Sequence, residues 1–376
     1  MNIKDFKAGT LKQGYEYQYF LPEKINHSFF WTDKIINELL EKASLRLGEL
    51  NSFSRFVPDT DIFIRMHIFK EAVVSSRIEG TRTNIQEAFN EVSDIDPEKR
   101  DDWIEVNNYV KAMNTAIHQL EKLPLSNRLI RNTHRQLLTS ARGKHKRPGE
   151  FRKSQNWIGG ASISDAVFVP PAYTELPELM TDFEQFLNNE GIGVPHLIKG
   201  AIAHYQFETI HPFLDGNGRI GRLLITLYLV SNRILDKPLL YLSDFFEKNK
   251  GLYYDNLTLV RSKNDLPQWI KFFLTGVIQT AENGVATLKK IVELKEHIEK
   301  DKIMNMGKRT KKGLELFHQL FGRPVVSVKR VEQMTGLSSK AANDLVRVFV
   351  EQNILKETTG AQRNRIFSFE EYIDMF

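Results

Sequence analysis

The chain has 376 residues, of which 41% are hydrophobic and 26% charged, and its mean hydropathy is −0.36. This composition is typical of a soluble globular protein with two or three structural units. There is no cysteine, which excludes disulfides, thiolate metal sites and a cysteine nucleophile. The N-terminus lacks the apolar run of a signal peptide, and no apolar stretch approaches the ~20 residues of a membrane span. We therefore expect a cytoplasmic protein without membrane contact.

The formal net charge is +5, and most of the excess lies in the last fifth of the chain. Residues 308–376 contain 12 Lys or Arg against 8 Asp or Glu. Such a basic terminal region fits a nucleic-acid or acidic-protein partner. It is equally typical of a solvated surface that meets no polyanion, so both interpretations stay open.

In chain order, the N-terminal region is predicted to begin as an irregular arm and to continue as helices. An amphipathic helix is expected around 35–45, where apolar positions recur every three or four residues. A second helix is expected at about 61–79, ended by Gly80. Further helical patterns cover 103–120 and 127–138.

The helical period is lost between 142 and 171, where glycine and proline are frequent. The segment 166–171 is short and β-branched, which predicts a small β-hairpin in this region. Helices resume near Leu176 and Pro195 and continue to about Glu299.

From Gly313 the pattern predicts a separate C-terminal unit. A helix at 314–321 is followed within 328–349 by two shorter helices with helix-turn-helix spacing. Residues 354–355 and 366–369 flank a polar tip, as the strands of a β-wing would. We therefore predict a winged helix, a fold that binds either DNA or protein.

The side chains of this unit leave its partner open. Ser338, Ser339 and Asn343 are of types that read bases only weakly. Four cations either contact phosphates or form a solvated face: Lys340, Arg347, Arg363 and Arg365.

The most informative segment runs from His211 to Arg222 and reads HPFLDGNGRIGR. The apolar run 223–230 follows directly and predicts a buried helix. The free N–H groups and the dipole of a helix N-terminus attract anions. The segment therefore places a base, a carboxylate, glycines and two guanidinium groups where a nucleotide polyphosphate could bind.

Each residue of the segment also has a purely structural interpretation. His211 could accept a proton from a hydroxyl, or be a core histidine. Asp215 could bind Mg²⁺, or cap the helix. Gly216 and Gly218 could let backbone amides approach phosphates, or form an ordinary turn.

Asn217 could donate to a phosphate or cap the helix. Arg219 and Arg222, three residues apart on a helix, could clamp a polyphosphate between two guanidinium groups. The order of these residues at a helix start favours the chemical interpretation over the structural one.

This segment resembles, at every specified position, the core motif of the Fic (filamentation induced by cAMP) family. The resemblance implies transfer of AMP from ATP, with Mg²⁺, to a Ser, Thr or Tyr hydroxyl of a protein, self-modification included. It implies that His211 is the general base, Asp215 the metal ligand and Phe213 an apolar anchor. A related toxin branch that phosphorylates has lysine in place of Gly218, so this glycine favours AMP transfer. The implied nucleotide-binding residues of the motif are Gly216, Asn217, Gly218, Arg219, Ile220, Gly221 and Arg222.

The segment from Ser75 to Gly80 resembles the inhibitory motif that some Fic proteins carry before the core. Glu79 lies at a predicted helix C-terminus, where the dipole disfavours an anion by ~0.3–1 kcal/mol, so a nearby cation would help to retain it. The resemblance identifies this cation as Arg222 and makes Ser75 and Glu79 inhibitory. The pair would occupy the guanidinium that the γ-phosphate of ATP needs. The alternative is an exposed glutamate at a helix end.

Residues 154–160 and 167–171 resemble the family's flap over the active site. Strand addition would dock a target segment there, with Ile158, Gly159 and Val169 as the docking residues. Tyr254, in the pair Tyr253–Tyr254, is spaced like the aromatics that flank adenine, although two tyrosines on a helix are often core residues.

The sequence thus predicts a mainly α fold, a Fic-type helical bundle with a small β-hairpin flap and a C-terminal winged helix-turn-helix domain. The expected regions are an N-terminal helical region (1–100) with an inhibitory helix (about 61–80), a catalytic core (101–300) with a flap (about 154–171), and the winged helix (308–376).

The predicted function is that of a protein adenylyltransferase autoinhibited in cis by Glu79. One alternative is removal of AMP, or transfer of another nucleotide, in the same site. The other is a DNA-binding regulator that acts through the winged helix. The expected partners are a protein substrate, DNA or protein at the winged helix, and a second copy in a homodimer.

Overall fold

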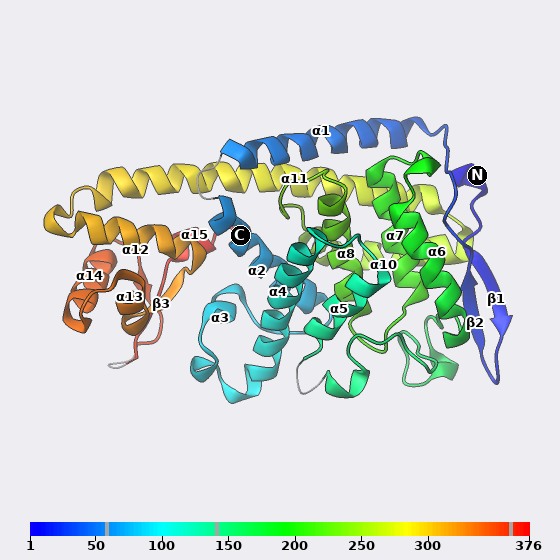
Figure 1. Ribbon diagram of the computed structural model, residues 1–376, viewed down its shortest axis with the longest axis horizontal. Coiled ribbons are helices and arrows are strands. Elements are labelled where there is room, and N and C mark those ends of the chain that lie inside the picture. Colours follow the sequence, from blue (N-terminus) through cyan, green and yellow to red (C-terminus); the bar gives the residue numbers. More distant parts are fainter. Residues whose placement is uncertain (57–59, 140–142, 361–363) are drawn as a thin grey trace.

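The computed structural model describes residues 1–56, 60–139, 143–360 and 364–376, and most of its elements are helices (Figure 1). The helices predicted from the sequence are present, several of them longer than expected. Before the C-terminal unit the structure has α1 (Lys34–Phe56), α2 (Thr60–Ile78), α3 (Ile85–Phe89), α4 (Arg100–Leu120), α5 (Asn127–Leu137), α6 (Leu176–Asn188), α7 (His196–Ile210), α8 (Asn217–Ser231), α9 (Ser243–Lys248), α10 (Lys250–Lys263) and α11 (Leu266–His297).

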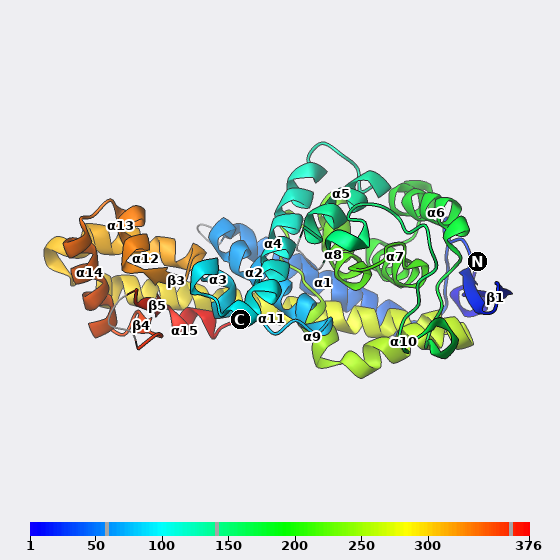
Figure 2. The ribbon, with the colours of Figure 1, turned by 90° about the horizontal axis from the view of Figure 1, so that it is seen from below.

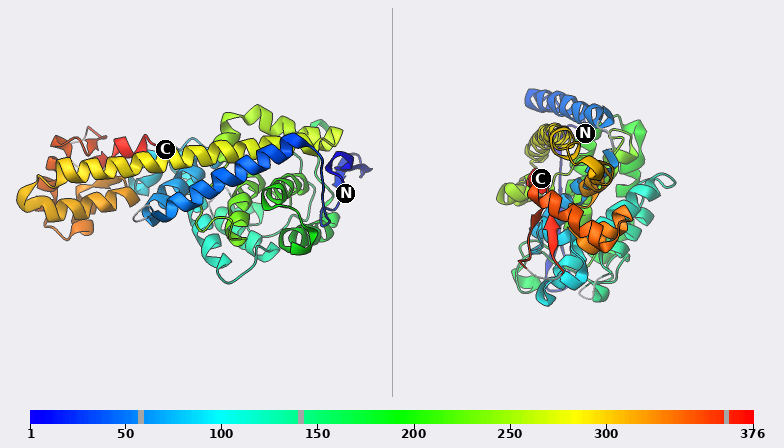
Figure 3. Two further views of the ribbon diagram at one scale, coloured as in Figure 1. Left: turned by 90° about the horizontal axis from the view of Figure 1, so that it is seen from above. Right: turned by 90° about the vertical axis from the view of Figure 1, so that its left-hand side faces the viewer.

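Helix α11 runs along most of the length of the molecule and connects its two ends (Figure 1). It continues as a π-helical turn over Ile298–Ile303. Helix α1 lies alongside it, as Figure 3 shows. Within the described ranges, no helix combines the length and the apolarity that crossing a bilayer requires.

The centre of the bundle is the antiparallel pair α7 and α8. Every residue of α7 from Leu197 to Ile210 is buried, and α8 is buried from Arg219 to Leu229. A helix that is enclosed on all sides lies inside the core rather than on its surface. The predicted motif covers the loop between these two helices and the start of α8, so the fold holds the motif between two buried helices.

Helix α2 lies between the central bundle and the C-terminal unit, which Figure 2 shows from below. Its first half packs on the C-terminal unit. The Phe63 and Phe321 rings meet edge to face at 5.6 Å, and His67 contacts the last residue, Phe376, at 4.9 Å between ring centroids. Its second half packs against α4, α8 and α9.

The described residues of the C-terminal unit form four helices and a three-stranded antiparallel sheet of order β3-β5-β4. Gly336, with φ +67°, ends the first helix of the predicted helix-turn-helix. We interpret this order of elements as a winged helix. Its elements are α12 (Thr310–Gly322), β3 (Val325–Ser327), α13 (Val328–Thr335), α14 (Ser339–Glu351), β4 (Lys356–Glu357), β5 (Ile366–Ser368) and α15 (Glu370–Ile373).

The prediction of an irregular N-terminal arm was wrong. The arm forms an antiparallel hairpin of β1 (Gly9–Gln13) and β2 (Gln18–Pro22). Four of the five β1 residues are exposed, so the strand shows none of the apolar alternation that predicts a half-buried strand. The turn contains Glu16 at φ +62°, a residue type that does not mark such turns.

The predicted hairpin over 154–171 is reduced to a single antiparallel bridge between Ile158 and Phe168. The pair exchanges two hydrogen bonds, of 2.8 and 3.1 Å. Pro170 and Pro171 follow and have no N–H, so the ladder cannot extend in that direction. Instead Phe20 of β2 donates to the Val169 carbonyl at 2.9 Å and lays the N-terminal hairpin beside the flap.

Candidate active site

The predicted motif forms the turn between α7 and α8. His211 is the C-cap of α7 with φ +49°, a left-handed conformation that few residues with a Cβ adopt. Gly216 precedes α8 with φ +76°, which glycine adopts freely. This turn brings His211 and the Asp215 carboxylate to the N-terminus of α8.

The turn is held by side-chain amides. Asn217 Oδ1 accepts from the Phe213 N–H at 2.8 Å, and its Nδ2 donates to the Phe213 carbonyl at 2.9 Å. Asn156 of the flap donates to the same carbonyl at 2.9 Å. The Asn217 side chain is therefore engaged by the turn, and its backbone N–H is the group that could bind a phosphate.

The Phe213 ring is fully buried and anchors the turn, as predicted. It stacks on His134 of α5 at 3.7 Å between ring centroids. His134 Nδ1 accepts from the Gly149 N–H at 2.8 Å, so its Nε2 donates to the Asp215 carbonyl at 2.9 Å. Burial lowers the pKa of His134 to about 4, so this hydrogen bonding persists at neutral pH.

Neither His134 nor Arg152, which also supports the turn, was identified from the sequence. Its buried guanidinium donates from Nε to the His211 carbonyl (3.0 Å) and from Nη2 to the Pro171 carbonyl (2.5 Å). Nη1 donates to the Ser154 carbonyl at 3.3 Å. One side chain thus ties the end of α7 to both arms of the flap. Burial lowers its pKa to about 10, which still leaves it charged at neutral pH.

His211 is a neutral base at physiological pH. Its Nδ1 lies 3.4 Å from the Glu208 carbonyl, which can only accept, so Nδ1 carries the proton and Nε2 the lone pair. Burial is the main cause that lowers its pKa to about 4. The positive charges of Arg152 and Arg261 act in the same direction, whereas Glu79 opposes them.

Asp215 fits a magnesium ion that arrives with a nucleotide. Its side chain is 44% exposed, and its Oδ1 accepts from the Gly216 N–H at 2.6 Å. Mg²⁺ in nucleotide sites is usually held by one or two carboxylates together with phosphates and water. Among the described residues no cluster of three His, Cys, Asp or Glu could hold a metal alone. A single carboxylate beside a helix N-terminus therefore suits a metal whose other ligands are phosphates.

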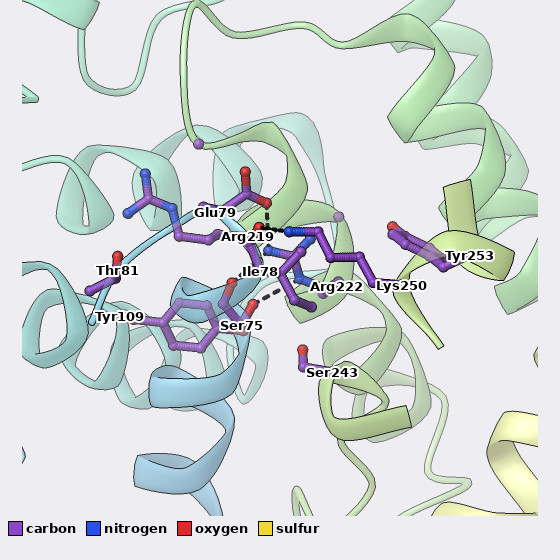
Figure 4. Close-up of polar contacts among 12 residues, drawn as sticks. Ser75, Ile78, Glu79, Thr81, Tyr109, Arg219, Arg222, Ser243, Lys250 and Tyr253 are labelled. Atoms are coloured by element: carbon purple, nitrogen blue, oxygen red, sulfur yellow. Dashed lines mark hydrogen bonds and ion pairs between the residues drawn. The ribbon is translucent and has the colours of Figure 1, made fainter. Parts of the chain in front are cut away.

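The predicted partner of Arg222 is present. Arg222 is 1% exposed, and its Nη2 donates to Glu79 Oε1 at 2.7 Å (Figure 4). The same Nη2 donates to the Ser75 carbonyl (2.8 Å), and Nε donates to the Ser75 hydroxyl (2.9 Å). A Cβ on Gly218 would stand 2.4 Å from Glu79 Oε1 and 2.9 Å from Arg222 Nη1. The carboxylate and Nη1 therefore both lie directly against the second glycine of the motif.

Glu79 and Arg222 are both charged in this arrangement. Burial raises the pKa of Glu79, but the attraction of Arg222, with a smaller one from Arg219, outweighs it and leaves the pKa below its usual value. For Arg222, burial lowers the pKa, and the attraction of Glu79 more than compensates. The Glu79 carboxylate and the Arg222 guanidinium thus form an ion pair at neutral pH.

Lys250 and Glu105, which were likewise not identified from the sequence, support the arrangement of Glu79 and the two arginines. Lys250, at the start of α10, donates to the Ile78 carbonyl at 2.8 Å, as Figure 4 shows. A cation on the last carbonyls stabilises a helix C-terminus, and here it fixes the end of α2 that presents Glu79. Glu105 of α4 lies 3.4 Å from Nη1 of Arg219, which is 5% exposed.

Some predicted nucleotide-binding residues face away from this site. Ile220 is 1% exposed and belongs to the core. Gly221 permits close helix packing, since a Cβ there would lie 2.1 Å from Glu208 Oε1. Tyr253 is buried, with its hydroxyl 2.9 Å from His204 Nε2, whereas Tyr254 is 43% exposed and lies within electrostatic range of Glu79.

The predicted docking residues of the flap differ in what they offer a target. Both backbone groups of Ile158 bond to Phe168, and the Val169 carbonyl accepts from β2. In an antiparallel pair the neighbours of such a residue turn their N–H and C=O groups outward. Gly159, together with the 42%-exposed Trp157, therefore presents the outer edge of the flap.

The predicted phosphate-contacting face of the C-terminal unit lies opposite acidic residues. Lys340 and Arg365 line a cleft of about 1120 Å³ that Glu91 and Asp94 also line. Arg347 pairs with two carboxylates of α14, and Arg363 lies outside the described residues. Contact with DNA or protein through this unit, and a homodimer, remain predictions.

Two sequence profiles match the chain. The profile described as Fic/DOC family N-terminal matches residues 37–118, and the profile described as Fic/DOC family matches residues 124–229. Together they span half of the chain, and the second includes the whole motif. The chain belongs to the Fic/DOC family.

Curated relatives of this Fic/DOC chain are named protein adenylyltransferase Fic. The relative from Aedes aegypti is 30% identical over 257 residues, which are 64% of this chain and 47% of the relative. The relative from Drosophila erecta is 34% identical over 136 residues, which are 34% of this chain and 25% of the relative. The chain thus spans less than half the length of these proteins.

Solved structures of Fic proteins share the fold. A Fic family protein from Desulfovibrio desulfuricans aligns over 90% of this chain and 97% of its own, with a TM-score of 0.56 and 21% identity. A Fic domain containing signaling protein from Bacteroides thetaiotaomicron aligns over 68% of this chain and 97% of its own, with a TM-score of 0.52 and 20% identity.

Replacing Arg152 by methionine should destabilise the protein by at least about 3 kcal/mol, because several buried carbonyls would lose their donor. Urea denaturation measures the change. Lys153→Met, at the exposed neighbouring position, is the matched control and should change the free energy of unfolding by less than about 0.5 kcal/mol. Equal effects of the two substitutions would contradict the assigned role.

Proposed function

We propose that this chain is a protein adenylyltransferase, which transfers AMP from ATP to a hydroxyl group of a protein, and that Glu79 inhibits it in cis. The observation that carries the proposal is the neutral His211 imidazole beside the N-terminus of α8, whose first turns also carry Arg219 and Arg222. The names of the curated relatives support the same reaction.

The nucleotide would bind with its phosphates at the N-terminus of α8. The backbone N–H groups of Asn217 and Gly218 and the helix dipole would hold the α- and β-phosphates, whereas the Gly216 N–H donates to Asp215. Arg222 would bind the γ-phosphate, and Tyr254 at the rim would contact adenine. Mg²⁺ held by Asp215 would neutralise charge on the phosphates.

His211 would act as the general base. Its Nε2 would take the proton of the target hydroxyl as the oxygen attacks the α-phosphorus in line. The bond between the α-phosphorus and the bridging oxygen would break, and pyrophosphate would leave. The chain's own residues thus position the two reactants and stabilise charge, and they form no covalent intermediate.

The target would bind as an extended segment along the outer edge of the flap. Hydrogen bonds to the backbone of Trp157 and Gly159 recognise an extended chain with little regard to its sequence. Asn156 links this strand to the carbonyls of His211 and Phe213, so the docked segment would lie over the base. A Ser, Thr or Tyr in that segment, including one of this protein's own, would be the acceptor.

Inhibition would follow from competition for Arg222. Glu79 Oε1 accepts the hydrogen bond from Arg222 Nη2 and fills the space against Gly218. A γ-phosphate would have to lie in the same space. A phosphate that enters would lose a guanidinium contact and meet a carboxylate. ATP would then bind poorly, or with its α-phosphorus out of line.

Glu79→Gly should raise the rate of AMP incorporation by at least about tenfold, because a charge-assisted hydrogen bond to Arg222 of ~1.5–3 kcal/mol no longer competes with the γ-phosphate. Incubation with α-labelled ATP, Mg²⁺ and cell lysate measures the rate. Glu79→Gln, which keeps the shape without the charge, should give an intermediate increase.

An unchanged or lower rate in Glu79→Gly would contradict inhibition by this residue. Release of AMP from an AMP-bearing protein by the native chain, lost in Glu79→Gly, would instead assign AMP removal, with Glu79 orienting a water.

His211→Ala, introduced into the Glu79→Gly chain, should lower AMP transfer by about 10²–10⁴-fold, the usual contribution of a general base. ATP affinity should stay within about twofold, because the imidazole contacts the hydroxyl rather than the phosphates. Calorimetry and mass-detected AMP transfer measure the two quantities. Transfer at the undiminished rate would exclude His211 as the base.

The rate of the Glu79→Gly chain should be nearly constant from about pH 6 to about pH 8. Burial lowers the pKa of His211 to about 4, and removal of Glu79, whose charge raises that pKa, lowers it further. The base is therefore unprotonated over this range, and activity should fall only near pH 4 or below. An acid limb centred near pH 6.5 would show that the base has an ordinary histidine pKa.

A further inference from the structure

Ser75 and Glu79 are not the only polar residues on the face of α2 that meets Arg222. The same face also carries Glu71. Glu71, Ser75 and Glu79 follow one another at intervals of four residues, so successive members are neighbours on the helix surface. Glu71 is 3% exposed and lies two turns before Glu79. It is the only one of the three that has no direct hydrogen bond to the guanidinium among the described contacts.

Glu71 receives hydrogen bonds from two other helices. The Tyr109 hydroxyl of α4 donates to its Oε1 at 3.0 Å, and the Ser243 hydroxyl of α9 donates to the same oxygen at 2.5 Å. Tyr109 is fully buried, and so is Ser243. The carboxylate is therefore the common acceptor where α2, α4 and α9 meet.

A series of polar contacts, through Ser75 and Tyr109, leads from Arg222 to this carboxylate. Arginine only donates, so the Ser75 hydroxyl accepts from Nε and directs its own proton elsewhere. That hydroxyl lies beside Tyr109 and interacts with it, and the Tyr109 hydroxyl donates to Glu71. Figure 4 shows Tyr109, Ser75 and Arg222 side by side. The Tyr109 donor thus points toward Glu71, and Ser75 lies between Tyr109 and Arg222.

This series matters because Glu79 and the γ-phosphate cannot use Arg222 together. Once Glu79 has left, the guanidinium must keep its orientation through contacts that remain. Those contacts are Ser75 on Nε and Nη2, which leave Nη1 turned to Gly218. The direction of the Ser75 hydroxyl depends on Tyr109, and that of Tyr109 on a charged acceptor.

We propose that Glu71 is a positioning residue: through Tyr109 and Ser75 it holds Arg222 in the orientation that binds a γ-phosphate, and so favours ATP over ADP. The inference rests on the proposed function for the identity of the ligand. It assigns to one buried carboxylate a role in choosing the nucleotide that is separate from the inhibitory role of Glu79.

The test compares the affinities for ATP and ADP, each with Mg²⁺, by calorimetry in the Glu79→Gly chain. Glu71→Gln removes the charge, and Tyr109→Phe interrupts the series while it preserves the packing of the ring. Measurements at about pH 8 keep Glu71 mainly ionised, since burial raises its pKa to about 7. Asp244→Asn is the matched control, because Asp244 lines the same cavity as Glu71 and pairs with Lys248.

We expect Glu71→Gln and Tyr109→Phe to weaken ATP binding by about tenfold and ADP binding by less than about twofold, because ADP has no γ-phosphate. Asp244→Asn should leave both affinities unchanged. An unaltered ratio of the two affinities in both variants would overturn the proposal. Equal losses for ATP and ADP would also overturn it, because they would indicate a merely structural role.

The two hypotheses fail separately in this design. If the Glu79→Gly chain binds ATP but transfers no AMP, the proposed function is wrong, while the affinity ratio still tests Glu71. If that chain transfers AMP and the ratio does not change in either variant, the role of Glu71 alone is wrong. Thermal unfolding shows whether the Glu71→Gln chain is folded. If it is not, the ratio of the ATP and ADP affinities in Tyr109→Phe tests the proposal instead.

Discussion

The guanidinium of Arg222 is almost entirely buried, and the arrangement around it follows from the need to pair a buried charge. In this structure its partners come from one helix, α2, through Ser75 and Glu79. A γ-phosphate is an equivalent anionic partner, and it would approach from the side of Gly218. The resting and active states of the proposed enzyme therefore differ mainly in which anion occupies the same guanidinium.

The position of α2 is set by contacts at both of its ends. Lys250 donates to the carbonyl of its last residue, Ile78, and Phe63 in its first turn packs against Phe321 of the C-terminal unit. The helix that presents Glu79 is thus also the helix on which the C-terminal unit rests. The catalytic turn has its own supports in Arg152 and His134, which do not involve α2.

The sequence predicted what depends on local pattern. Apolar periodicity located the helices, and the segment around Asp215 indicated an anion site because its residues are contiguous. The pairing of Glu79 with Arg222 followed only from a family resemblance. Arg152, His134 and Glu71 could not be found in this way, because each acts through partners distant in the chain. The N-terminal hairpin was missed because its first strand is exposed and carries no alternating pattern.

The most direct test is a crystal structure of the Glu79→Gly chain with Mg²⁺ and a non-hydrolysable ATP analogue. The account predicts the γ-phosphate on Nη1 of Arg222 against Gly218, the metal on Asp215, and the α-phosphorus in front of Nε2 of His211. A nucleotide bound elsewhere, or phosphates at the start of α8 with Arg222 still turned away from them, would contradict it.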